Sequence, residues 1–272
     1  MADIYGSHFM YGDVNSMRYG LVLANADTSR IRQLNGTREG VSIYNKKSNK
    51  RYLVADDLTS SPLSFDIDIV TESGRYLETY ERRMIEKWLF GNIRYRKLYI
   101  ESVDTCEVIN GVCKRCYLNC RFVNPEKIEG NGGIIGYKAT LEADSDMLWQ
   151  DPTAVRFDFS GHSANEQKTM IINVDTDSYG YLYPIVKIQI GENGGDVTIF
   201  NSADDSSRET KFEGVSPLAT IMMNGESNYV SNGAYSDLTK RNFVRLVDGE
   251  NTLCATGDIT AIDIEYSARR FL

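Results

Sequence analysis

Short β-strand patterns recur about every ten residues through the C-terminal half of the chain. In the last of them, Ile262 and Ile264 alternate with Asp263 and Glu265, which is the period-2 pattern of a strand that buries one face. Many short strands at this spacing favour two packed antiparallel sheets. The pattern therefore predicts an all-β sandwich with strands at residues 169–174, 182–190, 195–201, 208–213 and 218–223 and in the last thirty residues.

The segment Phe243–Leu272 predicts further strands separated by turns. We expect a strand at Phe243–Val247, a turn at Asp248–Asn251, a short strand, a turn at Thr256–Asp258 and a final strand that runs to Leu272. No catalytic motif accompanies these strands. We therefore interpret the C-terminal half as a scaffold.

Pro152 marks a boundary between two domains. Proline fixes its own φ and pushes Asp151 out of helical space, so one set of strands is expected to end at Leu148–Thr153. A chain of 272 residues is long enough for two domains with separate cores. We predict an N-terminal β-domain at residues 1–155 and a C-terminal β-sandwich at residues 156–272.

One amphipathic helix is predicted inside the N-terminal domain, at about residues 74–90. Its apolar stripe consists of side chains at helical spacing: Leu77, Tyr80, Met84, Ile85 and Trp88. Gly91 stands where a left-handed C-cap is expected. A single helix among strands is interpreted as a lid over an open sheet edge or a sandwich end.

The rest of the N-terminal domain has strand patterns, so the predicted fold class is mainly β. Strands are expected at Leu63–Val70, Tyr99–Ile109, Val112–Val123 and Gly136–Ala143. Asn110 and Gly111 predict a two-residue type I′ turn between the second and third of these strands. Glu129–Gly133 is predicted to be a flexible loop.

The net charge of −8 is concentrated in the C-terminal half, because residues 1–155 carry −1 and residues 156–272 carry −7. Tight DNA binding is not expected of an acidic chain without a basic stripe. No stretch approaches the roughly 18 apolar residues that a membrane helix needs. The N-terminus lacks the basic start and apolar run of a secretory signal, so we expect the chain to fold in a cytoplasm.

Four cysteines lie close together in the sequence: Cys106, Cys113, Cys116 and Cys120. A zinc site needs all four sulfurs at about 2.3 Å from one ion. With a turn at residues 110–111, Val108 pairs with Cys113 and Cys106 pairs with Arg115. Cys106 and Cys113 then share one face of the hairpin, and Cys116 and Cys120 share the other. Cys116 and Cys120 are four strand residues apart, about 13 Å at roughly 3.3 Å per residue, which is too far for one zinc ion. We expect buried or half-buried free thiols with no metal, and no disulfide framework in a chain with five cysteines and no export signal.

No other motif predicts a catalytic, cofactor or metal site. His8 and His162 have no ligand or base partner at a suitable spacing. Asp175–Gly180 begins like a calcium loop but has Tyr179 at the fifth position. Asp66 and Asp68 are expected on the solvated face of a strand. Seventeen tyrosines suit strands and also interfaces.

Several short motifs follow one another along the chain. Tyr11–Ser16 precedes Tyr19–Val22, the helix ends in Trp88–Gly91, and Trp149–Pro152 closes the N-terminal domain. The pattern F-x-x-L-x-x-G-x-N, followed by I-x-Y-x-x-R-x-x-L, lies in the last thirty residues. Together with their order, these motifs resemble the distal tail proteins of siphophages, which are hub and baseplate components of the phage tail. The resemblance covers most of the chain.

This resemblance implies a hexameric ring formed by the N-terminal domain and decorated by a galectin-like C-terminal sandwich. The ring would join the tail tube protein to tail-tip or baseplate proteins and anchor receptor-binding proteins, with DNA only in transit through its lumen. It implies a structural protein of the virion tail, assembled in the host bacterial cytoplasm, with no enzymatic activity, no cofactor and no membrane partner. Open sheet edges in residues 1–155 are the expected contact surfaces between neighbouring copies.

Two other function classes stay open. A carbohydrate-binding galectin-like module predicts a monomer or dimer that binds sugars. A hydrolase is the weaker alternative, because no nucleophile, base or metal set can be assembled from the sequence.

Overall fold

The protein is built mainly of antiparallel β-sheet with one α-helix, as predicted. The computed structural model describes residues 6–26, 37–45, 50–59, 62–101, 107–109, 111–130, 132–178, 180–204, 208–231 and 236–271. The chain divides into two compact units between Trp149 and Gln150. The expected boundary at residue 155 falls inside β13 (Thr153–Asp158), which pairs with β22 (Ile259–Tyr266) of the second unit.

One large sheet organises the N-terminal half. Its strands follow the order β2-β1-β7-β10-β11-β6-β3, and β12 pairs with β10. Among the described residues, β4 pairs only with β5 and β8 only with β9. A 3₁₀ helix, η1 (Ser16–Tyr19), joins β2 to β3. The strands are β1 (Phe9–Tyr11), β2 (Val14–Asn15), β3 (Leu21–Ala26), β4 (Thr37–Asn45), β5 (Lys50–Thr59), β6 (Ser64–Thr71), β7 (Arg96–Ile100), β8 (Glu107–Ile109), β9 (Val112–Lys114), β10 (Cys116–Gly130), β11 (Gly133–Ala143) and β12 (Leu148–Gln150).

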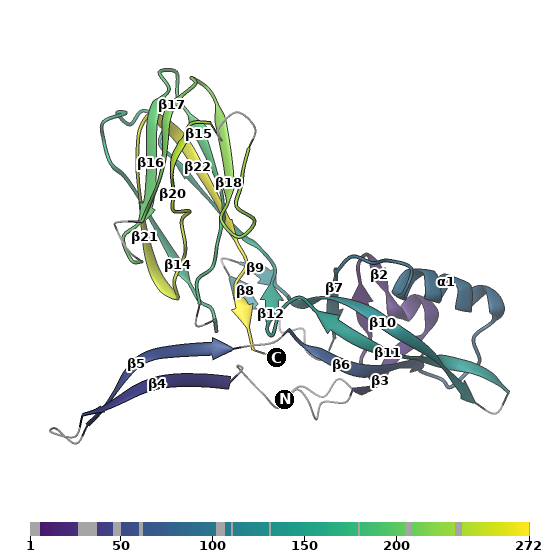
Figure 1. Ribbon diagram of the computed structural model, residues 1–272. Helices are drawn as coiled ribbons and strands as arrows, with labels where there is room; N and C mark the ends of the chain where they lie inside the picture. The colour runs from purple at the N-terminus through teal and green to yellow at the C-terminus, as the bar shows by residue number, and fades with distance from the viewer. Residues whose placement is uncertain are drawn as a thin grey trace. The chain divides into compact units, whose positions relative to one another are not determined.

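Alternation along these strands produces one apolar face. On β6 every second side chain is buried, namely Phe65, Ile67 and Ile69, as the sequence pattern predicts. Helix α1 (Thr79–Leu89) covers this face, since its Ile85 and Leu89 belong to the same core (Figure 1). The helix therefore packs on a face of the sheet and not, as expected, over an edge or end.

The helix differs from its prediction at both ends. It begins at Thr79, where the Glu81 carboxylate accepts hydrogen bonds from the Glu78 backbone N–H at 3.0 Å and from both Arg75 terminal nitrogens at 2.7 Å. The prediction of a left-handed C-cap at Gly91 is wrong, because the C-cap is Phe90 and its backbone has a right-handed helical conformation. A Cβ on Gly91 would lie 2.4 Å from the Lys87 carbonyl oxygen, so glycine is needed there for close approach.

The predicted apolar stripe of the helix is correct for Leu77, Ile85 and Trp88, which are buried. It is wrong for Tyr80, whose side chain projects into solvent at 71% exposure.

The described residues of the predicted flexible loop Glu129–Gly133 form the end of the β10–β11 hairpin, where Gly130 pairs with Gly133. Asn131 lies outside the described residues. A Cβ added to Gly132 would lie 3.1 Å from the Tyr76 hydroxyl, and a Cβ added to Gly133 would lie 3.3 Å from the Tyr76 ring. The glycines therefore leave room for an aromatic ring that crosses the hairpin end.

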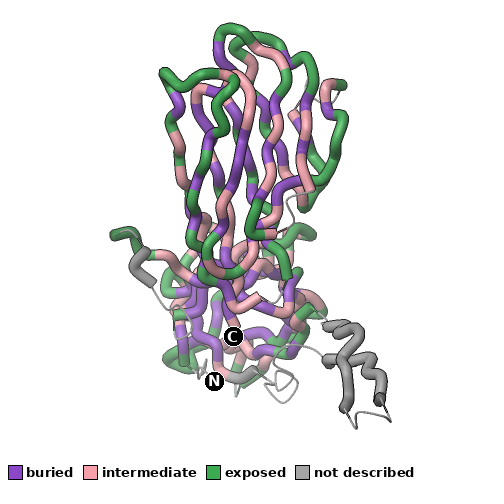
Figure 2. The backbone as a smooth tube through the Cα atoms, turned by 90° about the vertical axis from the view of Figure 1, so that its left-hand side faces the viewer, coloured by how far each residue is buried: buried purple, intermediate pink, exposed green. Residues whose placement is uncertain are grey.

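The second unit is a sandwich of two five-stranded sheets, ordered β13-β22-β15-β18-β19 and β14-β21-β16-β17-β20. Buried and exposed residues alternate along its strands (Figure 2), and the inward side chains of both sheets form one core. The predicted sandwich is confirmed, while its galectin-like character stays a prediction. The remaining strands of the sandwich are β14 (Lys168–Val174), β15 (Ile185–Ile190), β16 (Gly195–Asn201), β17 (Glu209–Val215), β18 (Thr220–Asn224), β19 (Tyr229–Val230), β20 (Leu238–Arg241) and β21 (Gly249–Thr256). A short strand, β23 (Arg269–Arg270), belongs to neither of its sheets.

The strand predicted at Phe243–Val247 is wrong. This segment makes one isolated bridge, between Leu246 and Leu182, yet its Phe243, Val244 and Leu246 side chains are buried. Its apolar residues fill the core without a strand ladder. The turn predicted at Asp248–Asn251 is correspondingly shorter, because β21 starts at Gly249.

Candidate interaction sites

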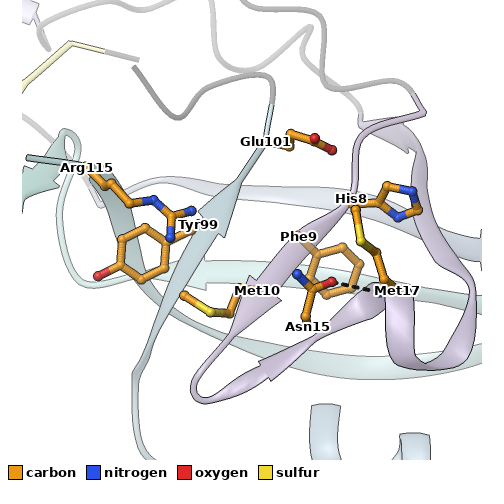
Figure 3. A pocket seen from close by; sticks show the side chains of 8 residues that line it. All are labelled: His8, Phe9, Met10, Asn15, Met17, Tyr99, Glu101 and Arg115. Carbon is orange, nitrogen blue, oxygen red and sulfur yellow. Dashed lines mark hydrogen bonds between the residues drawn. The ribbon is translucent and has the colours of Figure 1, made fainter. Parts of the chain in front are cut away.

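A depression of about 280 Å³ opens on the first unit beside β1 and β2 (Figure 3). Its lining comes from four separate stretches of the chain around residues 8–10, 15–17, 99–101 and 115. Met10 lies between its neighbours Asn15 on β2 and Tyr99 on β7, so the three side chains gather on one side of the sheet. No local sequence pattern marks this site, because strand pairing assembles it.

The rim of the depression presents Met17 to solvent. The Asn15 carboxamide oxygen accepts a hydrogen bond of 2.8 Å from the Met17 backbone N–H and so caps η1 (Figure 3). This short helix holds the Met17 side chain 55% exposed. His8 closes the same rim, with Nδ1 3.2 Å from the Leu21 carbonyl oxygen. An exposed methionine beside a lining of mixed polar and apolar side chains suits a protein-binding surface.

Cations and tyrosine rings alternate on the side of β7 and β10 that faces away from the core. The Arg115 guanidinium lies 4.4 Å over the Tyr99 ring, and the Lys97 ammonium lies 4.1 Å over the Tyr117 ring. The two tyrosine rings are 5.4 Å apart. Arginine and tyrosine are enriched at protein interfaces, and cation–π contacts hold these side chains in place. Because Tyr99 is only 8% and Tyr117 only 9% exposed, these contacts stabilise the first unit and leave little ring surface for a ligand.

The β4–β5 hairpin is a second candidate for intermolecular contact. Its strands have nine and ten residues and pair along their whole length. Within the described part of the chain, neither strand pairs with any other sheet. A two-stranded hairpin is marginally stable alone, so a partner strand or surface would stabilise it.

One of the four clustered cysteines departs from the expectation of free thiols. Cys113 is disulfide-bonded, whereas Cys116, Cys120 and Cys254 are buried thiols. The predicted pairing of Val108 with Cys113 is confirmed, and Gly111 has the positive φ of 78° that the turn requires. Asn110 and Cys106 lie outside the described residues. Burial raises the pKa of the Cys120 thiol far above its ordinary value, which keeps it protonated and unreactive.

The two histidines have structural neighbours. His162 lies 3.3 Å from Glu166 and packs edge-on against Phe159, while His8 lies 3.8 Å from Glu72. In the parts of the chain that the structure describes, no three His, Cys, Asp or Glu side chains are grouped to hold a metal ion. No helix in those parts has the length and apolar character to cross a membrane.

The acidic motifs are also structural. Asp66 accepts a hydrogen bond of 2.8 Å from the Thr140 hydroxyl across the sheet. Asp175 lies 3.1 Å from the Arg270 guanidinium. Tyr179 lies outside the described residues.

The sequence matches two protein-family models that together span nearly the whole chain. Residues 4–145 match the phage tail protein N-terminal domain, and residues 149–266 match the phage tail C-terminal domain. No curated protein matches the sequence significantly.

Solved structures share the fold. The SPP1 Dit protein, described as a paradigm of the hub adsorption apparatus in phages infecting Gram-positive bacteria, superposes with a TM-score of 0.63 at 10% identity, covering 98% of this chain and 99% of that chain. A chain of the phage P2 baseplate in its activated conformation with Ca superposes with a TM-score of 0.53 at 7% identity, with the same coverage of both chains. The corresponding baseplate structure with Sr gives 0.54 at 8% identity.

The motif-based expectation of a phage tail protein and the structural comparison point the same way, although at these identities the solved structures speak only for the fold. The first family model alone covers more than half of the chain. The chain therefore belongs to the phage tail protein family defined by these N- and C-terminal domains.

Proposed function

We propose that this protein is a distal tail protein, a structural hub of the phage tail that forms a hexameric ring. The ring joins the tail tube protein to the tail-tip or baseplate proteins and anchors receptor-binding proteins. The observation that carries the proposal is the two-unit fold shared over 98% of the chain with the SPP1 Dit hub protein. The family match to phage tail domains supports it independently.

The first unit has the surfaces that ring formation needs. A closed ring requires two different patches on each copy that fit each other, since its contacts are heterologous. The β4–β5 hairpin offers two strand edges without a partner among the described residues, and the depression beside β1 offers a socket of mixed polarity with an exposed methionine. Strand edges readily accept strands from neighbouring molecules. We place the contact between copies at this hairpin.

The role is mechanical, not enzymatic, and the protein acts in the virion tail after assembly in the host bacterial cytoplasm. DNA passes through the ring only in transit. Residues 156–272 carry most of the net negative charge, −7 of −8, which disfavours DNA binding.

A carbohydrate-binding role has weaker support. Tyr181 is exposed on the second unit, as a sugar-stacking ring must be. Its ring face is already covered by the Arg245 guanidinium at 3.5 Å. Arg245 in turn makes two hydrogen bonds to Asp204, at 2.7 and 2.9 Å, so it is not free to move aside.

Ring formation is tested by mass in solution and negative-stain imaging of the purified protein. We expect rings of six copies with a central hole, formed alone or on addition of the tail tube protein. A variant in which a short Gly-Ser linker replaces residues 37–59 should stay monomeric while both units unfold as in the wild type.

A variant that shortens the β8–β9 hairpin is the matched control and should form rings. Rings from the 37–59 variant would show that the hairpin is not the contact. A wild-type protein that is monomeric even with the tube protein would contradict the hub proposal.

A further inference from the structure

Leu218 is a bulky residue whose backbone conformation is unfavourable and whose side chain is not buried. Its φ is +57°, and its side chain is 73% exposed at the tip of a turn. In Ser216–Ala219 the Ala219 N–H bonds to the Ser216 carbonyl oxygen at 3.3 Å, and Pro217 precedes the residue with positive φ. This arrangement matches a type II turn, whose third position favours glycine or asparagine. A leucine there is strained, and its exposure leaves the strain without compensation from burial.

The turn belongs to a group of four connections at one end of the sandwich. These are the segments between β13 and β14, β15 and β16, β17 and β18, and β21 and β22, at the upper end of the second unit in Figure 1. We call them the loop platform. Strand register places them together, since Asp158 pairs with Ala261 and Gln189 with Thr220.

Backbone hydrogen bonds tie the loop platform together. Leu218 N–H donates to the Gly191 carbonyl oxygen at 2.9 Å, and Gly191 N–H donates to the Asp258 carbonyl oxygen at 2.8 Å. The buried Lys168 ammonium donates to the carbonyl oxygens of Ser163 and Gly257, both at 3.0 Å. The exposed leucine is therefore held by a rigid support, which lowers the entropy cost of binding.

The loop platform is strongly acidic. The four connections contain three carboxylates and no lysine or arginine. Three further carboxylates lie on the adjoining strands within three residues of the connections, together with Arg156, which pairs with Asp263, and Lys168, which is only 2% exposed. Lys211 is already paired with Glu213 at 2.6 Å and Asp196 at 3.7 Å. The carboxylates are those of Asp158, Glu166, Glu192, Asp196, Glu213 and Asp258. An apolar anchor with an acidic surround is complementary to an apolar socket with a basic rim.

We propose that the loop platform docks on a basic surface of another protein of the same tail, with Leu218 inserted into an apolar socket at the centre of that interface. This inference rests on the proposed hub function and deepens it by assigning a contact surface to the second unit. The acidic surround steers the partner and fixes its orientation, while Leu218 supplies most of the affinity.

Leu218→Asn in the phage that carries this protein is the decisive variant. Asparagine suits the positive φ, so the isolated variant should unfold at the same temperature as the wild type or above it. Tails purified from the variant phage should keep this chain but bind one other tail protein at least about tenfold more weakly. Quantitative mass spectrometry of the tails, washed at low salt and at ~1 M salt where the Debye length is about 3 Å, measures the loss.

Ile171→Asn is the matched control, because Ile171 is another exposed apolar residue of the same unit, at 61% exposure on β14. It should leave tail composition unchanged. A double variant, Glu192→Lys with Glu213→Lys, should release the same partner as Leu218→Asn and confirm the charge requirement.

Unchanged composition and salt resistance in Leu218→Asn tails would overturn the proposal. Variant tails that contain fewer copies of this chain would also overturn it, because the loop platform would then bind a second copy of this chain and not another tail protein. Absence of this chain from wild-type tails is a different result, and it would refute the hub function itself.

Discussion

Trp88 connects helix α1 to the sheet of the first unit, and its removal should destabilise that unit alone. The indole stacks on the Phe9 ring at 5.7 Å with an interplanar angle of 7°, and its Nε1–H donates to the Tyr11 carbonyl oxygen at 3.0 Å. Only 7% of the residue is exposed. The core that contains Trp88 shares no member with the core of the second unit.

The expected loss follows from these contacts. Trp88→Ala leaves a cavity and should cost about 3–5 kcal/mol of unfolding free energy. At an m-value of about 2 kcal/mol per molar urea, this lowers the unfolding midpoint of the first unit by about 2 M. Trp88→Phe keeps an aromatic ring but removes the N–H donor, so it should cost about 1–3 kcal/mol.

Hydrogen exchange with peptide-level mass spectrometry measures both units in one sample during urea unfolding. Peptides from β6 and β10 should lose protection early in Trp88→Ala, whereas peptides from β15 and β22 should not change. Tyr80→Ala is the control on the same helix, and it should change stability by less than about 0.5 kcal/mol because Tyr80 is 71% exposed. An equal loss in both units, or an equal cost for the two alanine variants, would refute the assignment of Trp88 to a separate core.

Three further substitutions test individual contacts. Lys168→Met leaves three carbonyl oxygens without their ammonium donor and should destabilise the second unit by about 1–3 kcal/mol in thermal unfolding; an unchanged melting temperature would contradict this role. Gly136→Ala puts a Cβ 2.2 Å from the Ile69 carbonyl oxygen and should cost about 1–3 kcal/mol of first-unit stability in urea unfolding. An unchanged unfolding midpoint would show that β6 and β11 move apart without cost. Burial raises the pKa of Tyr11 to about 12 from 10.0, so the stability that its neutral phenol contributes is complete below pH 10 and is lost as pH rises toward 12. Tyr11→Phe should reduce this alkaline loss of stability in pH-dependent unfolding, and identical profiles for variant and wild type would exclude Tyr11 as its source.

The strands that the sequence predicts best are those with one buried face. On β6 the alternation of Phe65, Ile67 and Ile69 with aspartates needs no knowledge of the partner strand, because one sheet face is dry and the other is wet. The Val108–Cys113 pair was predictable for a similar reason, since a two-residue turn fixes the register of its own hairpin.

The errors occur where a residue's role depends on a contact distant in sequence. Phe243–Val247 has the composition of a strand, but its neighbours leave it only the Leu182–Leu246 bridge. Gly132 and Gly133 look like loop residues until the Tyr76 ring is placed against them. The depression beside β1 combines four separate stretches of the chain, so no single stretch carries its pattern.

Residues that folding does not explain are the best guide to assembly in a protein without a catalytic motif. Trp88 and Lys168 are buried and bonded, so the fold itself accounts for them. Met17 is exposed, and Leu218 is both exposed and strained, so selection for stability alone would replace Leu218 with glycine or asparagine. Variants at such positions should lose tail assembly while keeping their melting temperature, and variants of the core should lose both together. This difference in behaviour separates the contact surfaces of a hub from its scaffold.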